Sequence, residues 1–246
     1  MKIVVVGGTG LIGSQVVGIL GGSGHEAVAA APTTGVDTLT GTGLAEALQG
    51  ADVVVDVSNS PSFEAEPALD FFTRSARNVT EAAKEAGVRH HVTLSVIGVD
   101  LLPENGYYRA KVAQEETVRD SGLPYTIVRA AQFFEFIAPV IAMSTQDGQV
   151  RLPSTQLRPI ASADVAAAVA AAAQGEPLRG VRFVAGPEIQ RLDRLGEITL
   201  AAEPDGRSVV TDETVGLFAG VPDGVLTGDD TVDTAPTRYE DWLKQH

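Results

Sequence analysis

The chain of 246 residues has no cysteine, one tryptophan and only 18 basic residues against 32 acidic ones. Without cysteine there is no disulfide, no thiolate metal site and no cysteine nucleophile, as is typical of a cytoplasmic protein. The net charge of −14 argues against nucleic acid or an anionic membrane as a partner, because either requires a basic face. No apolar run approaches the roughly 18 residues of a membrane span, and no set of His, Asp and Glu has metal-ligand spacing.

The remaining composition is that of a globular protein, with 44% hydrophobic and 20% charged residues. This length is enough for one domain with a substantial core. We predict a single domain over 1–246. Prolines, glycines and short β-rich pieces predict a small substrate-binding lobe, built mainly from about 132–160 and 186–246.

Strand-like and helix-like segments alternate along the chain. Strands are predicted at Ile3–Val6, Glu26–Ala31, Asp52–Val57, His91–Val96, Pro124–Arg129 and Val181–Ala185. Helices are predicted from about Ile12, at Leu44–Leu48, Phe63–Ala86, Tyr107–Asp120, Phe133–Met143 and Ala163–Ala173, and near Arg238–Leu243. Strands separated by helices predict an α/β fold, a Rossmann-like doubly wound parallel sheet with a small C-terminal substrate lobe.

The first strand runs directly into glycines spaced every third residue, in Gly7-Gly-Thr-Gly10-Leu-Ile-Gly13. Glycine accepts a positive φ, and its missing Cβ lets a pyrophosphate approach the backbone. The helix that follows offers unpaired N–H groups and the positive end of its dipole. This order of strand, turn and helix favours a dinucleotide site over a ligand-free tight turn. The predicted nucleotide-binding residues here are Gly7, Thr9, Gly10, Leu11, Ile12 and Gly13.

Tyr107 and Lys111 form Tyr-x-x-x-Lys, a spacing that puts both side chains on one face of a helix. An ammonium near a phenol lowers the pKa of the phenol from about 10, so that the tyrosine can exchange a proton near neutral pH. Ser95 ends the strand before this helix and can hydrogen-bond a reacting oxygen. The alternative is a strand-end serine, a packed tyrosine and a surface lysine without catalytic roles.

With these motifs the chain resembles the short-chain dehydrogenase/reductase superfamily, and its glycine spacing is similar to the atypical, NmrA-like NAD(P)-binding branch. The resemblance continues through Gly106–Glu115, Ser121–Arg129 and Arg158–Val165, and it covers residues 1 to about 170. It implies that Ser95, Tyr107 and Lys111 are the catalytic set. Tyr107 would be the general acid/base, and Lys111 would also bind the nicotinamide ribose.

The resemblance also implies that the substrate pocket opens after the fifth strand, at Gln132, Phe133 and Phe136. A Phe-Phe-x-Phe cluster is more often core than pocket, but here both interpretations stay open. The cofactor cleft is expected beside Val57 and Ser58, at the end of the third strand.

The choice of cofactor depends on the residues after the second strand, where an NAD site has an acidic residue and an NADP site has arginine. Here Val28 to Gly35 contains neither. Thr33 and Thr34 can donate to a 2′-phosphate and nothing repels one, which favours NADP(H) over NAD(H). The resemblance places Asp37 near the adenine amino group.

We therefore predict an NAD(P)-dependent oxidoreductase that transfers hydride between nicotinamide and a small carbonyl, quinone or imine-like substrate. The alternative is an NmrA-type NAD(P)-sensing regulatory protein without turnover. A sugar-nucleotide epimerase or dehydratase is disfavoured, because the small lobe leaves little room for a second nucleotide. The sequence leaves open the substrate, the direction of reaction and whether the chain forms a homodimer.

Overall fold

The computed structural model describes residues 1–246 and divides into two compact units. The first comprises Met1–Arg129 with Val165–Arg182, and the second comprises Ala130–Asp164 with Phe183–His246. The segments predicted to form the lobe lie within the second unit. Substrate binding by this unit stays a prediction.

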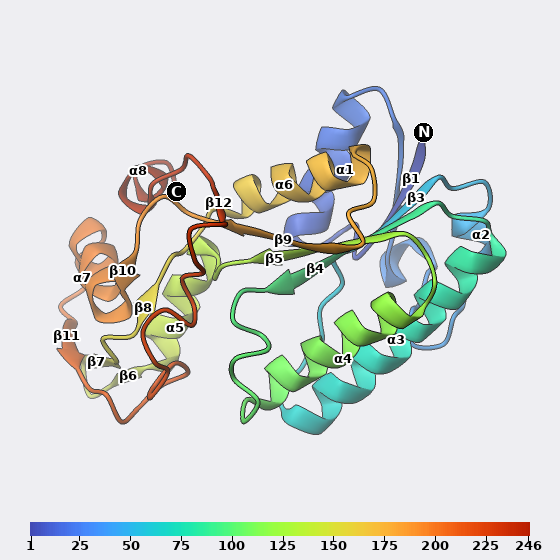
Figure 1. The fold of residues 1–246 in the computed structure, drawn as a ribbon. Coiled ribbons are helices and arrows are strands. Elements are labelled where there is room, and N and C mark those ends of the chain that lie inside the picture. Colours follow the sequence, from blue (N-terminus) through green and yellow to red (C-terminus); the bar gives the residue numbers. More distant parts are fainter. The chain divides into compact units, whose positions relative to one another are not determined.

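Strands and helices alternate through most of the chain (Figure 1). The elements as far as the fifth strand are β1 (Lys2–Val6), α1 (Leu11–Gly22), β2 (Glu26–Ala30), η1 (Pro32–Thr34), α2 (Leu44–Leu48), β3 (Val53–Asp56), α3 (Ala65–Glu85), β4 (His90–Val96), α4 (Gly106–Asp120) and β5 (Tyr125–Ala130). The later elements are η2 (Phe134–Phe136), α5 (Ile137–Met143), β6 (Thr145–Gln146), β7 (Gln149–Leu152), β8 (Gln156–Leu157), α6 (Ser162–Gln174), β9 (Gly180–Ala185), β10 (Gln190–Arg191), α7 (Leu192–Ala202), β11 (Ser208–Thr211), β12 (Asp233–Thr234) and α8 (Tyr239–Leu243).

Seven strands form a parallel sheet in the order β12-β9-β5-β4-β3-β1-β2. From β1 the chain crosses to β2 on one side and then returns to β3 on the other. The strand order therefore reverses between β1 and β3, which makes their carboxyl ends the place where ligands bind in sheets of this kind. The prediction of a doubly wound α/β fold is confirmed.

Within the first unit, α3 and α4 lie side by side on one face of the strands, and α1 lies on the other (Figure 1). The apolar residues of α3 recur every three or four positions, so one stripe of the helix is buried. At the start of α4, a Cβ on Gly106 would lie 2.3 Å from the Cβ of Ala65. The N-terminal ends of the two helices therefore cross at a separation that only glycine permits at this position.

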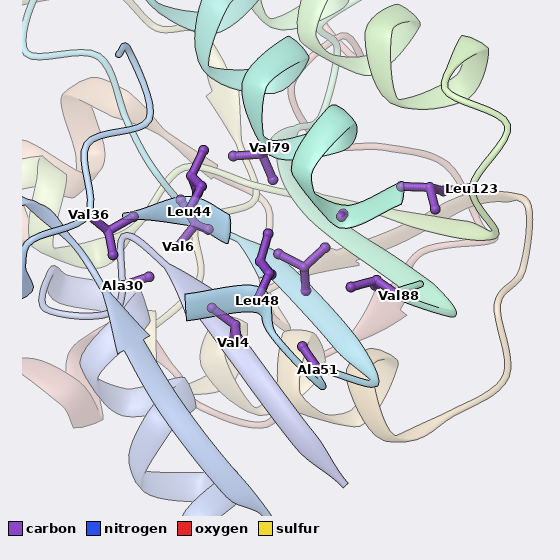
Figure 2. Packing of buried hydrophobic residues seen from close by; sticks show 12 residues of the cluster. Val4, Val6, Ala30, Val36, Leu44, Leu48, Ala51, Val79, Val88 and Leu123 are labelled. Atoms are coloured by element: carbon purple, nitrogen blue, oxygen red, sulfur yellow. The ribbon is translucent and has the colours of Figure 1, made fainter. Parts of the chain in front are cut away.

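Beneath α2, the core of the first unit is a cluster of aliphatic side chains without an aromatic ring (Figure 2). Leu44 and Leu48, both fully buried, extend from α2 toward Val4 and Val6 of β1, and Val79 of α3 closes the cluster. The short α2 is held by this packing, because a five-residue helix is not stable by itself.

Two helical segments differ from the sequence-based expectation. The single helix predicted over Phe133–Met143 is a 3₁₀ turn, η2, followed by α5. Because α5 begins at Ile137, Pro139 falls in its first turn, where the missing N–H costs no hydrogen bond. The helix α7 was not predicted. It contains Gly196, which the packing requires, because a Cβ there would lie 2.6 Å from the side chain of Leu152.

No helix combines the length and the hydropathy that crossing a membrane would require.

A buried ion pair joins α4 to β5. The carboxylate of Glu115, which is fully buried, accepts from Nε and Nη2 of Arg129 at 2.9 and 2.7 Å, and from Arg119 at 2.7 Å. Nη1 of Arg129 donates to Asp100, which is half exposed, at 2.9 Å. Despite the burial of Glu115, the hydrogen bonds from Arg129 and the nearby hydroxyl of Ser95 hold the pKa of its carboxyl below the usual range.

We expect Glu115→Ala to lower the free energy of unfolding by about 3–5 kcal/mol, because it leaves the buried Arg129 charge without its main partner. The matched variant Asp100→Ala removes an exposed partner of the same arginine and should cost less than about 1 kcal/mol. Urea unfolding of the two variants measures the difference. Equal losses would contradict the assignment of Glu115 as the main partner.

His91 on β4 is fully buried, and neither of its ring nitrogens has a hydrogen-bond partner. Burial lowers the pKa of His91 to about 4, against the opposing attraction of the Asp56 carboxylate. The unfolded chain binds this proton near pH 6.5 and the folded chain only near pH 4, so stability is lost as the pH falls between these values. We expect the loss to reach about 3 kcal/mol.

The control for this pH effect is His91→Leu, which removes the titrating ring and keeps the position apolar. Its unfolding free energy should fall less steeply than that of the wild type between pH 7 and pH 4. Denaturant unfolding at several pH values makes the comparison. Parallel curves would show that His91 is not the cause of the wild-type loss.

Candidate functional site

The glycine turn after β1 contacts both strands that flank β1. The N–H of Gly7 donates to Ala30 O at 2.8 Å, at the end of β2. Gly7 has φ +76°, and a Cβ on it would lie 2.9 Å from the N atom of Ser58, just beyond β3. No other residue fits, because both the backbone conformation and the contact with Ser58 exclude a side chain.

The next two motif glycines are required for different reasons. A Cβ on Gly13 would lie 2.1 Å from Gly7 O, so this glycine serves the packing of the turn itself. A Cβ on Gly10 would have Gly7 O at 3.4 Å as its nearest neighbour, so packing within the protein does not require glycine there. Gly10 is the N-cap of α1, without a side-chain cap and without an acidic residue in the first turn. This exposed helix N-terminus fits the pyrophosphate of a dinucleotide.

The other predicted cofactor residues lie around this turn in different environments. Leu11 is half exposed whereas Ile12 is buried, so Ile12 can face a ligand only through its backbone. The hydroxyls of Thr33 and Thr9, both exposed, are 3.5 Å apart. Asp37 accepts from the N–H of Leu39 at 2.8 Å.

Thr34 differs from its neighbour Thr33, because its hydroxyl is already used by the backbone. It accepts from the N–H of Ala31 at 2.9 Å and faces the carbonyls of Ala29 and Ala31 at 3.1 and 3.0 Å. The expectation that Thr34 donates to a 2′-phosphate is therefore wrong for this structure. Thr33 keeps that role as a prediction.

The phenol of Tyr107 lies at the start of α4 and donates to Oδ1 of Asn59 at 2.7 Å. Aromatic rings surround it: the centroid of Phe63 is 5.2 Å away and that of Phe72 is 5.7 Å away. Burial, and to a smaller extent Tyr108, raises the pKa of Tyr107, while the hydrogen bond from Tyr107 to Asn59 opposes the increase. The phenol is therefore neutral at pH 7.

The ammonium of Lys111 is buried and is held by other groups. It donates to Leu94 O at 2.8 Å and to Oε1 of Gln114, and it lies 4.4 Å from the centroid of the Phe72 ring. Burial lowers the pKa of Lys111 to about 8, and the carboxylates of Asp56 and Glu115 limit the decrease. A change of charge at Lys111 is thus close to the physiological range.

Asp56 is the last residue of β3 and is completely buried. Its Oδ1 accepts from the N–H and the hydroxyl of Ser58 at 3.0 and 2.6 Å. Its Oδ2 accepts from Nε2 of Gln114 at 3.1 Å. Through Gln114 the carboxylate is linked to Lys111, so the end of β3 and the middle of α4 are joined by one polar chain.

The side chain of Ser95 is buried in β4, and its hydroxyl has no hydrogen bond of good geometry. It nevertheless faces the carboxylate of Glu115, whose pKa it helps to lower.

No hydrogen bond joins any two of Ser95, Tyr107 and Lys111 in this structure. The expectation that Lys111 lowers the pKa of Tyr107 is wrong here, because the ammonium turns toward Leu94 O and Gln114 and burial dominates the phenol. The catalytic roles of the three residues stay a prediction.

The predicted substrate residues belong to the second unit. Gln132 is buried, and Phe133 and Phe136 are half-buried. Between them, Phe134 is part of the core and packs against Tyr239 and Trp242 of α8, with centroids 5.0 and 5.7 Å away. The aromatic cluster is therefore core at one of its positions, and substrate binding by the others is untested.

Three polar residues of this region were not singled out from the sequence: Asp56, Asn59 and Gln114. Asp56 could have been predicted from the sequence, because it directly follows Val53-Val54-Val55 and a charged residue that ends a buried strand must have hydrogen-bond partners. Gln114 is three residues from Lys111 and so shares its helix face. Nothing in the sequence predicts the role of Asn59, since asparagine is common in turns.

No group of three or more His, Asp or Glu side chains is arranged to hold a metal ion.

Comparison with known proteins identifies a family whose members are similar to this chain. Residues 7–176 match the model of a family described as NAD(P)H-binding. A "(4-alkanoyl-5-oxo-2,5-dihydrofuran-3-yl)methyl phosphate reductase" of Streptomyces griseus is 32% identical over 202 residues, which cover 76% of this chain and 68% of that protein. The photosystem II assembly factor Ycf39 of Synechocystis is 25% identical over 175 residues, covering 65% of this chain and 54% of that protein.

Among solved structures, the NADPH complex of the NADPH-dependent quinone oxidoreductase QOR2 from Escherichia coli superposes with a TM-score of 0.74. The superposition covers 99% of each chain at 22% sequence identity. At this identity the likeness shows a shared fold.

We expect Gly10→Ala to weaken NADPH binding at least about tenfold, because its methyl group occupies the place where the pyrophosphate would approach the helix. Its stability should fall by less than about 1 kcal/mol. Gly13→Ala should instead lower stability by about 1–3 kcal/mol, since its methyl group meets Gly7 O. Nicotinamide fluorescence and thermal unfolding separate the two effects. Unchanged NADPH affinity in Gly10→Ala would contradict the site.

Proposed function

Because this chain belongs to the NAD(P)H-binding family, we propose that it is a reductase acting on a small carbonyl, quinone or imine-like compound, with Tyr107 as proton donor. One observation carries the proposal. The backbone of Ser58 contacts the glycine turn at Gly7, and the next residue, Asn59, holds the phenol of Tyr107. A proton donor is thus adjacent to a turn that fits a dinucleotide.

The family relationship bears on the two functions considered from the sequence, an oxidoreductase and a regulatory protein without turnover. The relative at 32% identity is a reductase, and its alignment spans about three quarters of this chain. This confirms the hypothesis of an NAD(P)-dependent oxidoreductase over that of an NmrA-type regulatory protein without turnover. Within the family, we propose that the chain belongs to the NmrA-like branch of atypical short-chain reductases, which its glycine spacing supports.

Bound NADPH would supply the hydride, and the residues of this chain would supply position and a proton. The state of Tyr107 favours the reductive direction. Its raised pKa keeps the phenol protonated at neutral pH, as reduction of a carbonyl requires. Oxidation of an alcohol would need a phenolate, which the aromatic surroundings disfavour.

The preference for NADP(H) over NAD(H) rests on the end of β2. No acidic side chain lies among residues 31–36 to accept from a ribose 2′-hydroxyl or to repel a 2′-phosphate. Thr33 is exposed beside Thr9 at the glycine turn and can donate to a phosphate oxygen. Asp37 remains the residue assigned to the adenine.

The substrate side is assigned to Gln132, Phe133 and Phe136 of the second unit. The half-buried rings of Phe133 and Phe136 support a small apolar substrate. Within the first unit, Phe63 exposes 58% of its surface and lies beside Tyr107.

We expect Tyr107→Phe to lower kcat at least about 100-fold on a panel of carbonyls and quinones, because the variant keeps the ring but loses the proton donor. Its affinity for NADPH should be unchanged. Tyr108→Phe is the matched control, since it removes the neighbouring phenol from the same helix turn, and it should retain turnover. Full activity in Tyr107→Phe would remove Tyr107 from the mechanism.

A further inference from the structure

The hydroxyl of Tyr107 has one hydrogen-bond partner, the side-chain amide of Asn59, at 2.7 Å. The rest of the ring is enclosed by Phe63, Phe72 and Tyr108, with centroids 5.2, 5.7 and 6.3 Å away. None of these rings can stabilise a charge on the phenol oxygen as a hydrogen-bond donor would. The amide is therefore the polar group that determines where this hydroxyl points.

The ammonium that the motif would place beside Tyr107 is engaged elsewhere. Lys111 donates to Leu94 O and to Gln114, and Gln114 in turn donates to the buried carboxylate of Asp56. To reach the phenol, Lys111 would have to leave this buried polar chain, which costs the hydrogen bonds of each member. In this chain the amide of Asn59 occupies the position next to the phenol.

The backbone that carries Asn59 is held firmly. Both the N–H and the hydroxyl of Ser58 donate to Asp56, at 3.0 and 2.6 Å. On its other side Ser58 meets the glycine turn at Gly7. Asn59, although exposed itself, therefore projects from a fixed turn between the predicted dinucleotide site and Tyr107.

From this arrangement we infer that Asn59 is a positioning residue of the reductase reaction, orienting the Tyr107 hydroxyl and then stabilising the phenolate that proton transfer leaves behind. The inference rests on the proposed function for the role of Tyr107. In the resting arrangement Oδ1 accepts from the phenol. A half-turn of the amide then presents an Nδ2–H to the phenol oxygen, which releases the phenol proton toward the substrate oxygen. When the O–H bond of Tyr107 breaks and the proton joins the substrate oxygen, the same Nδ2–H stabilises the phenolate. Water then returns a proton to Tyr107.

An isosteric substitution separates the two parts of this role. Asn59→Asp keeps an oxygen that accepts from the phenol but has no donor for the phenolate, and it adds a like charge. Asn59→Ala removes both functions. The substitution Ser62→Ala is the control, because Ser62 lies in the same loop and its hydroxyl accepts from the N–H of Glu64 instead.

The test uses the full chain with its four tyrosines replaced by a fluorinated, more acidic tyrosine. The ¹⁹F resonance of residue 107 is assigned by its loss in Tyr107→Phe, and its titration midpoint is compared among variants. We expect Asn59→Ala and Asn59→Asp to raise the midpoint by about one pH unit or more, with the larger increase in Asn59→Asp. The Ser62→Ala control should not shift it.

The same variants, with ordinary tyrosine, are then assayed for turnover. We expect kcat to fall about 10–100-fold in both Asn59 variants, with unchanged KM, NADPH affinity and thermal stability. A midpoint and a kcat equal to those of the wild type would overturn the inference while the proposed function stands. Parallel losses of stability, NADPH affinity and kcat would also overturn it, since such losses are expected when a residue only supports the fold. A wild type that turns over no panel substrate would instead overturn the proposed function.

Discussion

The buried carboxylate of Asp56 is the interaction on which the geometry of the site depends. A charge without water must be compensated by hydrogen bonds, and Asp56 obtains them from Ser58 on one oxygen and from Gln114 on the other. The first pair fixes the turn after β3, and the second draws α4 onto the sheet. The turn that carries Asn59 and the polar chain that holds Lys111 therefore meet at one buried carboxylate.

This polar chain also explains why Tyr107 and Lys111 of the Tyr-x-x-x-Lys motif do not contact each other through their polar groups. On an isolated helix, Tyr107 and Lys111 would be neighbours one turn apart. Folding adds a carbonyl, an amide and the face of Phe72, and together these hold the ammonium on the inner side of the helix. The phenol, left among aromatic rings, bonds to an amide that neither its own helix nor its motif contains. The hydrogen-bond partners of Tyr107 and Lys111 are therefore determined by tertiary contacts and not by their spacing along the helix.

Most of the fold could be predicted from the sequence because its signals are local. β-branched runs such as Val53-Val54-Val55, the spacing in α3, and glycines beside strand ends each identify an element without reference to the rest of the chain. The partners of Tyr107 and Lys111 could not be predicted in this way. Asn59 is 48 residues from Tyr107, and Asp56 is 58 residues from Gln114, so their contacts exist only once the sheet has formed. The position of Pro139 in the first turn of α5 likewise depends on where that helix begins, which the spacing of apolar residues did not predict.

The close crossing of α3 and α4 at Gly106 and Ala65 also bears on the position of Tyr107. Tyr107 follows Gly106 directly, so the height of the phenol above the strand ends is set by how closely two helices approach. One methyl group at this crossing would displace the phenol without altering any residue that faces a ligand. Residues 65 and 106 can therefore change the position of Tyr107, although neither belongs to the candidate site.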